Sequence, residues 1–285
     1  MTDCTFGTLY VVATPIGNLN DMVPRAVDVL QMVDIIAAED TRHSAKLLQY
    51  FGVSTKVIAY HDYSNEQCLQ KILNILYQGQ SVALISDAGT PLISDPGYKL
   101  VSMSRQSGVA VVPIPGACAL IAALSVSGLP SNQFIFEGFL PAKTSARIQA
   151  LKKLKRELRT IVLYESPHRL LDSLADIQRI LGDGRHIVIA RELTKTYETL
   201  LTGKIKDVID TIKADDNQRR GEFVLLLKGW EFDDSDQVIS SETERLMGIL
   251  LEELPVTQAA SIAAKFTSLK KRDLYQWALD RQSDS

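Results

Sequence analysis

Short, almost entirely apolar segments alternate with longer amphipathic segments through the first half of the chain. The apolar runs predict buried strands at 9–13, 33–38, 56–60, 81–86 and 110–113. The segments between and after them have the spacing of helices at 24–32, 65–78, 98–107 and 119–127. Strands that are apolar almost throughout are typical of parallel sheets whose two faces are both covered by helices. The pattern therefore predicts an α/β fold with a mostly parallel N-terminal sheet.

The second half of the chain continues with strands and helices but with a less regular alternation. Its strands are predicted at 133–139, 160–164, 186–190, 199–203 and 222–228, and its helices at 144–158 and 167–181. Residues 231–244 hold six carboxylates and no basic residue, which is typical of a solvated linker. Residues 245–279 then predict two or three short helices. We predict two α/β domains, 1–116 and 117–232, followed by an acidic linker and a small helical extension, 233–285.

The overall composition excludes several classes of protein. The chain has 285 residues, 46% of them apolar and 23% charged, with a formal net charge of −3, so a largely disordered chain is excluded. No apolar stretch is long enough to span a membrane, and the N-terminus lacks the basic segment of a signal peptide. The odd, widely spaced cysteines Cys4, Cys68 and Cys118 indicate thiols in a reducing compartment. We therefore expect a cytoplasmic protein.

Small and polar residues gather where the predicted parallel strands end. The segments concerned are 14–18, 39–42, His61, 86–97 and 115–118. Ligands of open α/β sheets bind outside the carboxyl ends of the strands, where glycines allow close approach of the backbone. Each segment alone would be an ordinary turn, because Gly, Pro, Asp and Ser dominate turns. Five of them at one sheet edge predict a ligand site there.

Familiar nucleotide, hydrolase and metal motifs are missing. The sequence has no G-x-G-x-x-G after its first strand, no phosphate-binding P-loop and no G-x-S-x-G. The four histidines lack metal-ligand spacing and have no cysteine partners, so no metal is expected.

A cluster of positive charge lies at 143–159, where seven of seventeen residues are basic and one is acidic. On a helix, Arg147, Lys152, Lys155 and Arg159 would share roughly one face. Such a face is either an ordinary solvated surface or a contact for phosphates, and the net negative charge of the whole chain favours an RNA contact. A second cluster, Lys265 with 270–272, is equally compatible with RNA binding and with packing on the core.

The segments at the strand ends carry a resemblance to a known family. The matching segments are 14–19 (TPIGNL), 38–42 (AEDTR), 86–91 (SDAGTP), 94–97 (SDPG), 164–169 (YESPHR), 191–195 (RELTK) and 221–222 (GE). In this order they resemble the ribosomal RNA small subunit methyltransferase I family, a branch of the tetrapyrrole methylases. Two loops differ from the porphyrin branch of this superfamily. Residues 14–18 replace that branch's G-x-G-P-G-D, and Asp87-Ala88-Gly89 replaces its Gly-Asp-Pro. Both differences favour the RNA branch.

The resemblance implies a two-domain tetrapyrrole-methylase-like fold with a mixed C-terminal sheet, and usually a homodimer. It implies S-adenosylmethionine as the cofactor and methyl donor, and the ribose 2′-hydroxyl of a cytidine in 16S rRNA of the small ribosomal subunit as the acceptor. The residues that it implies for the cofactor are Pro15, Asp87, Ala88, Gly89, Ala117, Cys118, Tyr164 and Glu222.

The acceptor hydroxyl needs help to lose its proton, from a positioned base or a nearby cation. We select Glu39, Asp40 and Lys195 as catalytic residues from a wider set that includes Arg42, His61, Glu165, Arg191 and Glu192. The alternative is that Glu39, Arg42, Arg191 and Glu192 form structural ion pairs. Arg42 and Arg169 suit phosphate, because a guanidinium can bind two oxygens at once.

Two rival functions stay open at this point. One is a methyltransferase of the same superfamily that acts on a small corrin or porphyrin, and the other is a non-catalytic RNA-binding adaptor. The basic cluster disfavours the first, and the complete set of strand-end segments disfavours the second. The sequence does not identify the general base or the modified nucleotide.

Overall fold

The computed structural model describes residues 6–61, 66–231, 241–267 and 269–283. Its contacts divide the chain into two units, residues 1–230 and 231–285, and each is considered by itself. The first unit holds two five-stranded sheets, and no boundary at 116 divides its contacts, so the separation of 1–116 from 117–232 stays a prediction. Within the described residues no helix is long and apolar enough to cross a membrane.

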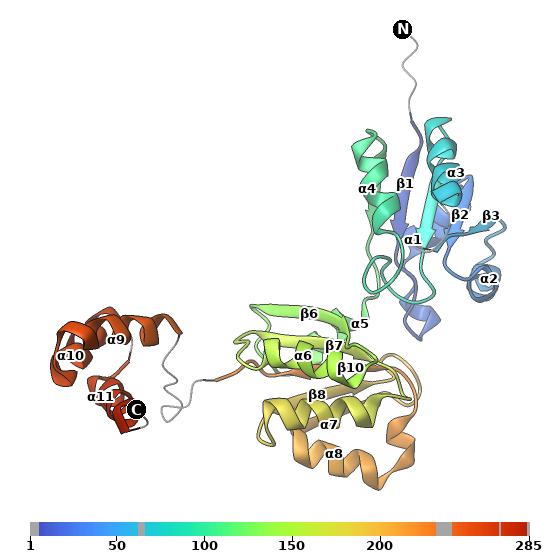
Figure 1. Cartoon of the computed structure of the whole chain (residues 1–285). Coiled ribbons are helices and arrows are strands. Elements are labelled where there is room, and N and C mark those ends of the chain that lie inside the picture. Colours follow the sequence, from blue (N-terminus) through green and yellow to red (C-terminus); the bar gives the residue numbers. More distant parts are fainter. Residues whose placement is uncertain (1–5, 62–65, 232–240, 268, 284–285) are drawn as a thin grey trace. The chain divides into compact units, whose positions relative to one another are not determined.

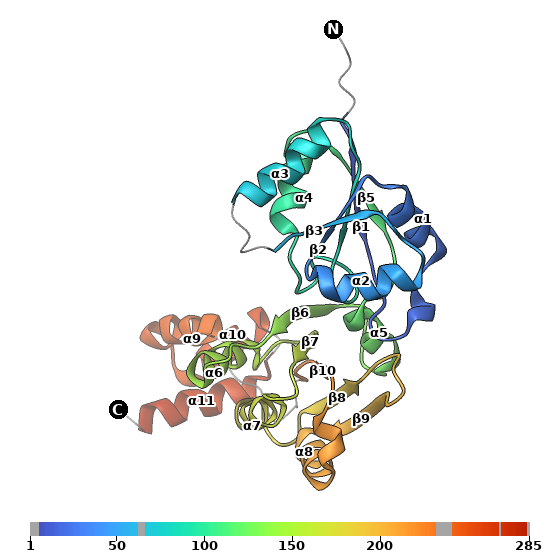
Figure 2. The same cartoon turned by 90° about the vertical axis from the view of Figure 1, so that its right-hand side faces the viewer.

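The first sheet is entirely parallel, with the strand order β3-β2-β4-β1-β5. Figures 1 and 2 show its strands and helices in blue to green. Its strands are β1 (Thr8–Val12), β2 (Ile35–Ala38), β3 (Lys56–Ala59), β4 (Val82–Ile85) and β5 (Ala110–Ile114). The helices between them are α1 (Pro24–Met32), α2 (Thr41–Tyr50), α3 (Glu66–Tyr77) and α4 (Tyr98–Gln106).

Helices cover both faces of this sheet. Successive residues of a strand point to opposite faces, so Ile36 packs into a core with residues of α1 and α2, whereas Ile35 and Ala37 pack with residues of α3 and α4. The neighbouring strands β1 and β4 are thus followed by helices on opposite faces. This reversal is the topological switch point at which open α/β sheets bind ligands.

The second sheet is mixed, with the order β6-β7-β10-β8-β9. Only β6 and β7 are parallel, and the other neighbours are antiparallel. Its strands are β6 (Phe134–Phe139), β7 (Thr160–Glu165), β8 (His186–Arg191), β9 (Thr199–Lys204) and β10 (Phe223–Leu227). Its helices are α5 (Ala119–Val126), α6 (Thr144–Leu154), α7 (Leu170–Leu181) and α8 (Ile205–Ala214). Two short 3-10 helices complete the first unit: η1 (Leu19–Asp21) follows β1, and η2 (Asp216–Arg219) follows α8.

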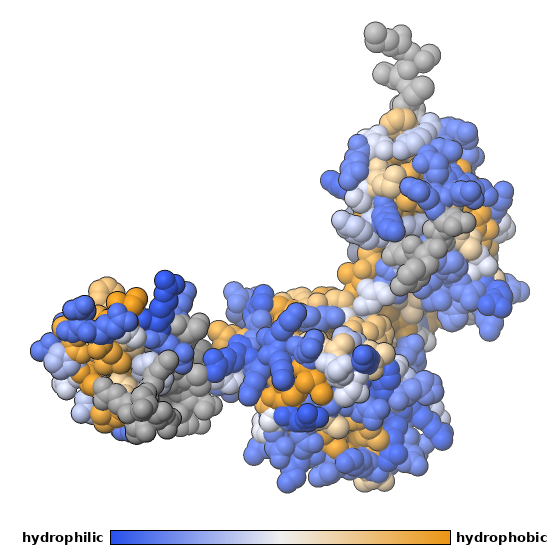
Figure 3. Space-filling view, viewed as in Figure 1, coloured by the Kyte–Doolittle hydropathy of each residue, from blue (hydrophilic) through white to orange (hydrophobic). Residues whose placement is uncertain are grey.

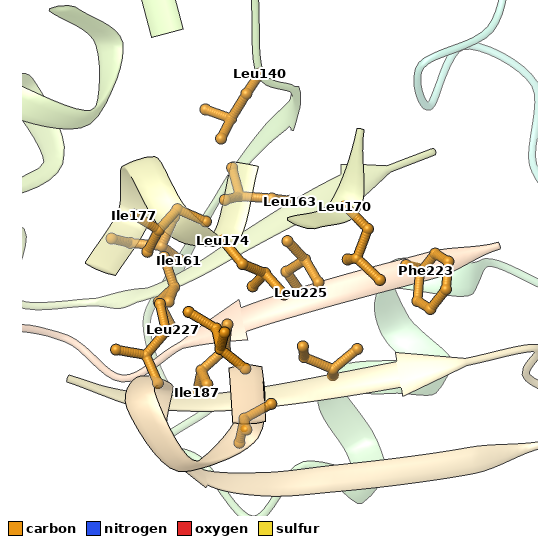
Figure 4. Packing of buried hydrophobic residues seen from close by; sticks show 14 of the residues in the cluster. Leu140, Ile161, Leu163, Leu170, Leu174, Ile177, Ile187, Phe223, Leu225 and Leu227 are labelled. Carbon is orange, nitrogen blue, oxygen red and sulfur yellow. The ribbon is translucent and has the colours of Figure 1, made fainter. Parts of the chain in front are cut away.

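The two faces of the second sheet are covered differently. A large apolar core joins one face to α6, α7 and α8, and Figure 4 shows how Leu163, Leu174 and Leu225 contribute to it. On the other face, α5 packs through Leu120 and Leu124. These two sheets and their helices confirm the predicted fold class.

The second unit consists of α9 (Ser241–Glu253), α10 (Val256–Phe266) and α11 (Lys271–Ser283). Their core is built largely from alanines, among them Ala259, Ala260 and Ala263, with Leu274. Small side chains let helix backbones approach closely. Of the acidic segment 231–244 predicted as a linker, residues 232–240 lie outside the described residues, and residues 241–244 form the first turn of α9.

Two helices are not predicted by the sequence pattern, and one predicted helix is too long at its end. Helix α2 was not predicted, because it is largely polar and buries only Ser44 and Leu48. Helix α8 was also missed, although its buried residues Ile205, Val208, Ile209 and Ile212 have helical spacing. Helix α6 ends at Leu154 and not at 158, so Arg159 does not belong to it.

Candidate active site

The segments that follow β1 and β4 are hydrogen-bonded to each other at the switch point. The amide of Thr14 donates to the carbonyl of Gly89 (2.8 Å), and the amide of Gly89 donates to the carbonyl of Thr14 (3.0 Å). The Thr14 hydroxyl also donates to the carbonyl of Ser86 (3.2 Å). Gly89 has φ +86°, and a Cβ there would lie 3.2 Å from Ile16 Cγ2, so this close approach requires glycine. Both segments are therefore held in fixed positions beside each other.

A cavity of about 370 Å³ opens next to this pair of segments. Its volume lies within the range of small-molecule binding sites, and its lining is mainly apolar. The first sheet contributes Ile16 and residues of 88–95. The second sheet and α5 contribute residues at 118–119, 164–167 and 222–224, together with Phe139, Ala190 and Leu193.

The cofactor residues implied by the resemblance fall into two groups. Ala88, Gly89, Cys118, Tyr164 and Glu222 line the cavity. Pro15, Asp87 and Ala117 lie beside lining residues and do not line it themselves. The Ala117 carbonyl accepts a hydrogen bond from the Thr90 hydroxyl (2.9 Å), and Asp87 Oδ1 accepts one from the Asp40 amide (3.1 Å). Asp87 and Ala117 thus fix the surrounding segments.

Tyr164 joins the second sheet to the start of α5. Its hydroxyl accepts a hydrogen bond from the amide of Leu120 (3.1 Å), and its ring packs edge-on against Phe136 and Phe139. Burial, with a smaller contribution from Cys118, raises the pKa of Tyr164 well above its ordinary value. The phenol consequently stays protonated and acts as a fixed wall of the cavity.

Lys195 lies in an ion-pair cluster with Glu192 and Glu222. Its ammonium Nζ donates to Glu192 Oε1 (2.9 Å) and to Glu222 Oε2 (2.8 Å). Burial alone would lower the pKa of Lys195, but the hydrogen bonds to Glu222 and Glu192 outweigh it and raise that pKa. Lys195 therefore stays a cation at neutral pH, beside a carboxylate that lines the cavity, and is not a proton acceptor.

The segment that carries this cluster has an unusual backbone. Glu192 (φ +51°) and Thr194 (φ +67°) adopt left-handed conformations that non-glycine residues rarely take. Gly17, in the segment after β1, lies so close that a Cβ there would be 2.4 Å from Lys195 Cγ. Strained residues of this kind persist where the surrounding structure holds them, often at functional sites.

Of the other predicted catalytic residues, Asp40 has a structural role in this fold. Its carboxylate caps the N-terminus of α2 by accepting from the Arg42 amide (2.8 Å), and Arg42 also pairs with it (3.4 Å). Hydrogen bonds from the backbone and side chain of Arg42 lower the pKa of Asp40. Neither Glu39, Asp40 nor His61 lines the cavity.

The expectation that Arg147 faces RNA is wrong. Arg147 is only 4% exposed, and its guanidinium pairs with the buried Asp176 of α7 (2.6 Å) and donates to the Ala142 carbonyl. Arg147 therefore does not share a solvent face with Lys152 and Lys155.

The guanidinium of Arg169 is also occupied inside the protein. It donates to the Leu140 carbonyl and lies 3.6 Å from Glu165, whose carboxylate is fully buried. Arg191 is buried and donates to the carbonyls of Arg220 (2.7 Å) and Tyr197 (3.1 Å). These two arginines connect loops through the named carbonyls, and the phosphate contact of Arg169 stays a prediction.

Exposed basic side chains do remain at the end of α6. Lys152, Lys153, Lys155 and Arg156 are all exposed. Arg159 is exposed too but forms a two-pronged ion pair with Glu157 (2.7 and 2.8 Å), which lowers the pKa of Glu157 to about 2. The surface over α6 is mainly hydrophilic in Figure 3.

The structure adds a residue that sequence reasoning did not select. Asp95 lies in the motif 94–97, which the resemblance used, and its side chain lines the cavity. Burial, with smaller contributions from the carboxylates of Glu39 and Asp87, raises the pKa of Asp95 to about 6, against the opposing effect of a hydrogen bond from Ser86. Within the described residues, no cluster of three His, Cys, Asp or Glu side chains could hold a metal ion.

Comparison with solved structures agrees with this architecture. A cobalt precorrin-4 methyltransferase of cobalamin biosynthesis aligns with a TM-score of 0.58 at 17% identity, over 78% of this chain and 94% of that one. A uroporphyrin-III C-methyltransferase from Thermus thermophilus, solved in complex with S-adenosylhomocysteine, aligns with a TM-score of 0.53 at 17% identity, over 78% and 97%. At this identity the likeness shows the fold.

Sequence comparison gives the family. The tetrapyrrole (corrin/porphyrin) methylase family matches residues 8–209, and the RsmI C-terminal HTH domain family matches residues 237–282. The ribosomal RNA small subunit methyltransferase I of Pseudomonas aeruginosa is 51% identical, over 98% of this chain and 99% of its own. The protein of that name from Vibrio cholerae is 52% identical over 95% and 94%, and the one from Synechocystis is 48% identical over 98% and 99%. The chain thus belongs to the ribosomal RNA small subunit methyltransferase I family of the tetrapyrrole methylases.

Proposed function

We propose that this protein transfers a methyl group from S-adenosylmethionine to the ribose 2′-hydroxyl of a cytidine in 16S rRNA of the small ribosomal subunit. The observation that carries the proposal is the cavity at the switch point, in a chain about half identical over its length to rRNA small subunit methyltransferases. The cavity supplies the cofactor site, and the family supplies the class of substrate.

The residues around the cavity suit this cofactor. S-adenosylmethionine brings a methyl group on a positively charged sulfur, together with an apolar thioether chain and an adenine ring. The mainly apolar lining suits the ring and the chain, and the carboxylate of Glu222 suits the positive charge. The small side chains of Ala88 and Gly89 leave room for a ligand to approach this wall of the cavity closely.

The protein's contribution to methyl transfer is mainly positional. The hydrogen-bonded segments after β1 and β4 hold one wall of the cavity, and Tyr164 holds the opposite element through Leu120. A rigid site of this kind orients the acceptor oxygen in line with the methyl group, and such orientation is a large part of catalysis. Lys195 adds a fixed positive charge near Glu222.

Exposed basic residues at the end of α6 and just after it support an RNA acceptor. Lys152 and Lys155, with Lys153 and Arg156, give a local positive charge that only Glu157 offsets. Contacts to phosphates supply most of the sequence-independent affinity for nucleic acids. A methyltransferase for a small porphyrin has no need of this surface, and so the RNA acceptor is favoured.

We further propose that the protein acts as a homodimer in the cytoplasm, where small ribosomal subunits are found. Ile121 and Val126 of α5 are 52% and 55% exposed, although α5 is otherwise apolar and packed on the second sheet. A second copy would cover these side chains. Light scattering is expected to give twice the mass of one chain, and the mass of a single chain would exclude the dimer.

The acceptor is tested by transfer of a tritiated methyl group to 30S subunits from a strain that lacks the endogenous activity, followed by alkaline hydrolysis. A 2′-O-methyl group blocks cleavage at its own linkage, so label in an alkali-resistant dinucleotide is expected. Label in mononucleotides would show methylation of the base and would refute the ribose acceptor. A parallel reaction with a porphyrin substrate should give no labelled pigment, and labelled pigment without labelled rRNA would favour the small-molecule function.

A further inference from the structure

Methylation of a ribose hydroxyl releases one proton, and the described residues that line the cavity include few groups able to accept it. Lys195 stays protonated beside Glu192 and Glu222, and Asp40 is a helix cap away from the cavity. The carboxylate of Glu165 lies at the cavity but is buried and accepts hydrogen bonds from Ser166 and Ser173. Glu222 lines the cavity with its carboxylate bound to Lys195.

Asp95 differs from these groups in its position. It lines the cavity on the segment between β4 and α4, together with Thr90, Ile93 and Ser94. The segment has a constrained backbone, because Leu92 (φ 74°) and Ser94 (φ 68°) are left-handed residues that are not glycine. Asp95 lies close to Ser86, whose hydroxyl donates to the carbonyl of Gly89 (3.3 Å) in the same interlocked region as Thr14. A carboxylate at a cavity wall, on a segment whose neighbouring residues are held in left-handed conformations, is typical of a functional residue.

We propose that Asp95 is the general base that accepts the proton of the ribose 2′-hydroxyl during methyl transfer. This inference rests on the proposed ribose acceptor. In the step, the oxygen–methyl bond forms as the sulfur–methyl bond breaks, and the electron pair of the broken bond stays on sulfur. The hydroxyl proton passes to an Asp95 carboxylate oxygen and then to solvent, so that charge and atoms balance.

The electrostatic surroundings of Asp95 support this role. Burial, with the nearby carboxylates of Glu39 and Asp87, raises its pKa to about 6, against the hydrogen bond from Ser86. A general base works best when its pKa lies near the working pH, because it is then ionised and still basic. The other titratable groups facing the same cavity are Cys118, Tyr164, Glu165 and Glu222.

The test compares wild type with Asp95→Asn in single-turnover methylation of 30S subunits between pH 5 and 8.5. The wild-type rate should rise with pH with a midpoint near 6. The variant should be slower by about 10²- to 10⁴-fold and should lack this midpoint, because general acid–base catalysis contributes rate factors of that size. Asp28→Asn, the same change at an exposed position on the outer surface of α1, is the matched control and should keep the wild-type profile.

Two further measurements separate catalysis from structure. Calorimetric binding of S-adenosylmethionine should be within about threefold of wild type in Asp95→Asn. In NMR spectra of protein labelled with ¹³C at the aspartate carboxyls, one resonance should titrate near pH 6 and be missing from the variant.

The outcomes are distinguishable. Alkali-resistant label made by the variant at the wild-type rate, or a variant that retains the midpoint near 6, would overturn the role of Asp95. A variant that loses cofactor binding in proportion to its rate would also overturn it, in favour of a structural role. If the wild-type protein makes no alkali-resistant label, the proposed ribose acceptor is refuted. The assignment of Asp95 as its general base is then refuted too, whatever the Asp95→Asn variant does.

Discussion

Asp95 affects stability as well as catalysis, because its carboxyl is harder to ionise in the folded protein. Its pKa rises from an ordinary 3.8 to about 6, mainly through burial. A carboxyl with a raised folded-state pKa gives its full stability below the unfolded pKa and loses it as the pH rises through the folded pKa. The free energy of unfolding therefore decreases between pH 4 and pH 6. At neutral pH the wild-type protein is less stable by the full amount of this decrease.

We predict that Asp95→Asn raises the free energy of unfolding at pH 7.5 by about 1–2 kcal/mol. The full shift corresponds to about 3 kcal/mol, and partial solvent screening reduces it. At pH 4 the difference should nearly vanish, because the wild-type carboxyl is then protonated in the folded state. Urea unfolding at both pH values measures the effect. An equal change at pH 4 and 7.5 would show that titration of Asp95 is not its cause, and Asp28→Asn should change neither value.

The buried pair of Arg147 and Asp176 gives a second prediction at the residue scale. Arg147→Ala leaves the Asp176 carboxylate buried without its partner, and the expected loss is about 3–5 kcal/mol in the free energy of unfolding. The double variant Arg147→Met with Asp176→Leu should recover most of that loss, because apolar residues often replace a buried ion pair at little cost. Urea unfolding of the single and double variants gives the comparison.

The RNA affinity of the double variant is the complementary measurement. Since Arg147 does not face solvent, this variant should bind 30S subunits as wild type does. A clear loss of RNA affinity in a stably folded double variant would mean that Arg147 reaches RNA after all.

The two residues show where sequence reasoning about the site stops. The sequence does not single out Asp95, because Ser, Asp, Pro and Gly in succession are ordinary turn residues. What sets Asp95 apart is its burial near Glu39 and Asp87. Glu39 follows β2, whereas Asp87 and Asp95 follow β4, so the proximity of Glu39 to Asp95 appears only in three dimensions. Arg147 was misjudged for the related reason that its partner Asp176 lies on another helix. Local spacing identifies the segments of the site, and tertiary contacts decide what each side chain does.

At the scale of elements, the end of α6 carries a prediction about RNA. Lys152 and Lys155 are exposed, and phosphate contacts weaken with salt in proportion to their number. Changing both lysines to Glu should weaken binding to 30S subunits and reduce the slope of log affinity against log salt by about 2, about 1 for each contact. Filter binding at several salt concentrations measures both quantities.

The matched control for α6 changes Lys71 of α3 and Lys99 of α4 to Glu, which alters the net charge equally. If binding depended only on total charge, both pairs would weaken it to the same extent. An α6 effect no larger than the control would remove α6 from the RNA contact.

The predictability of each element follows from its burial. Strands such as β2 and β4 are buried along their whole length and stand out as apolar runs. Helix α2 buries little and begins at the cap Asp40, which was interpreted as a catalytic carboxylate. Aspartate is common both as a helix cap and as a catalytic residue. The hydrogen bond that the Asp40 carboxylate accepts from the Arg42 amide identifies Asp40 as a cap. Polar helix starts are therefore easily mistaken for sites.

At the scale of the whole molecule, the cavity depends on segments that are far apart in sequence. The Thr14–Gly89 pairing joins β1 to β4, Thr90 reaches Ala117, and Tyr164 reaches Leu120 from the second sheet. The parallel order of the first sheet brings the segments after β1, β4 and β5 to one edge of that sheet. The alternation of strands and helices in the sequence predicts this arrangement. The contribution of the second sheet came from the resemblance, because no periodicity in the sequence indicates which strand ends face the first sheet.

The unit at 231–285 extends the RNA prediction beyond the catalytic unit. Four basic residues of this unit are exposed: Lys265, Lys270, Lys271 and Arg272. The family model that matches residues 237–282 is named for the helix-turn-helix, a nucleic-acid-binding motif. We predict that changing Lys270, Lys271 and Arg272 together to Glu weakens binding to 30S subunits about 10- to 100-fold at low salt, with cofactor affinity unchanged.

The control for this unit must carry the same change of charge elsewhere on the chain. Lys204, Lys206 and Lys213, at the end of β9 and on α8, are exposed and suit this purpose. Binding to 30S subunits and calorimetry with S-adenosylmethionine would be measured for both triple variants. Selective loss of 30S binding in the first variant would assign RNA contact to the C-terminal unit, because the buried Leu274 and the alanines of its core are untouched. Equal binding in the two variants would contradict that assignment and leave the RNA contact to the first 230 residues.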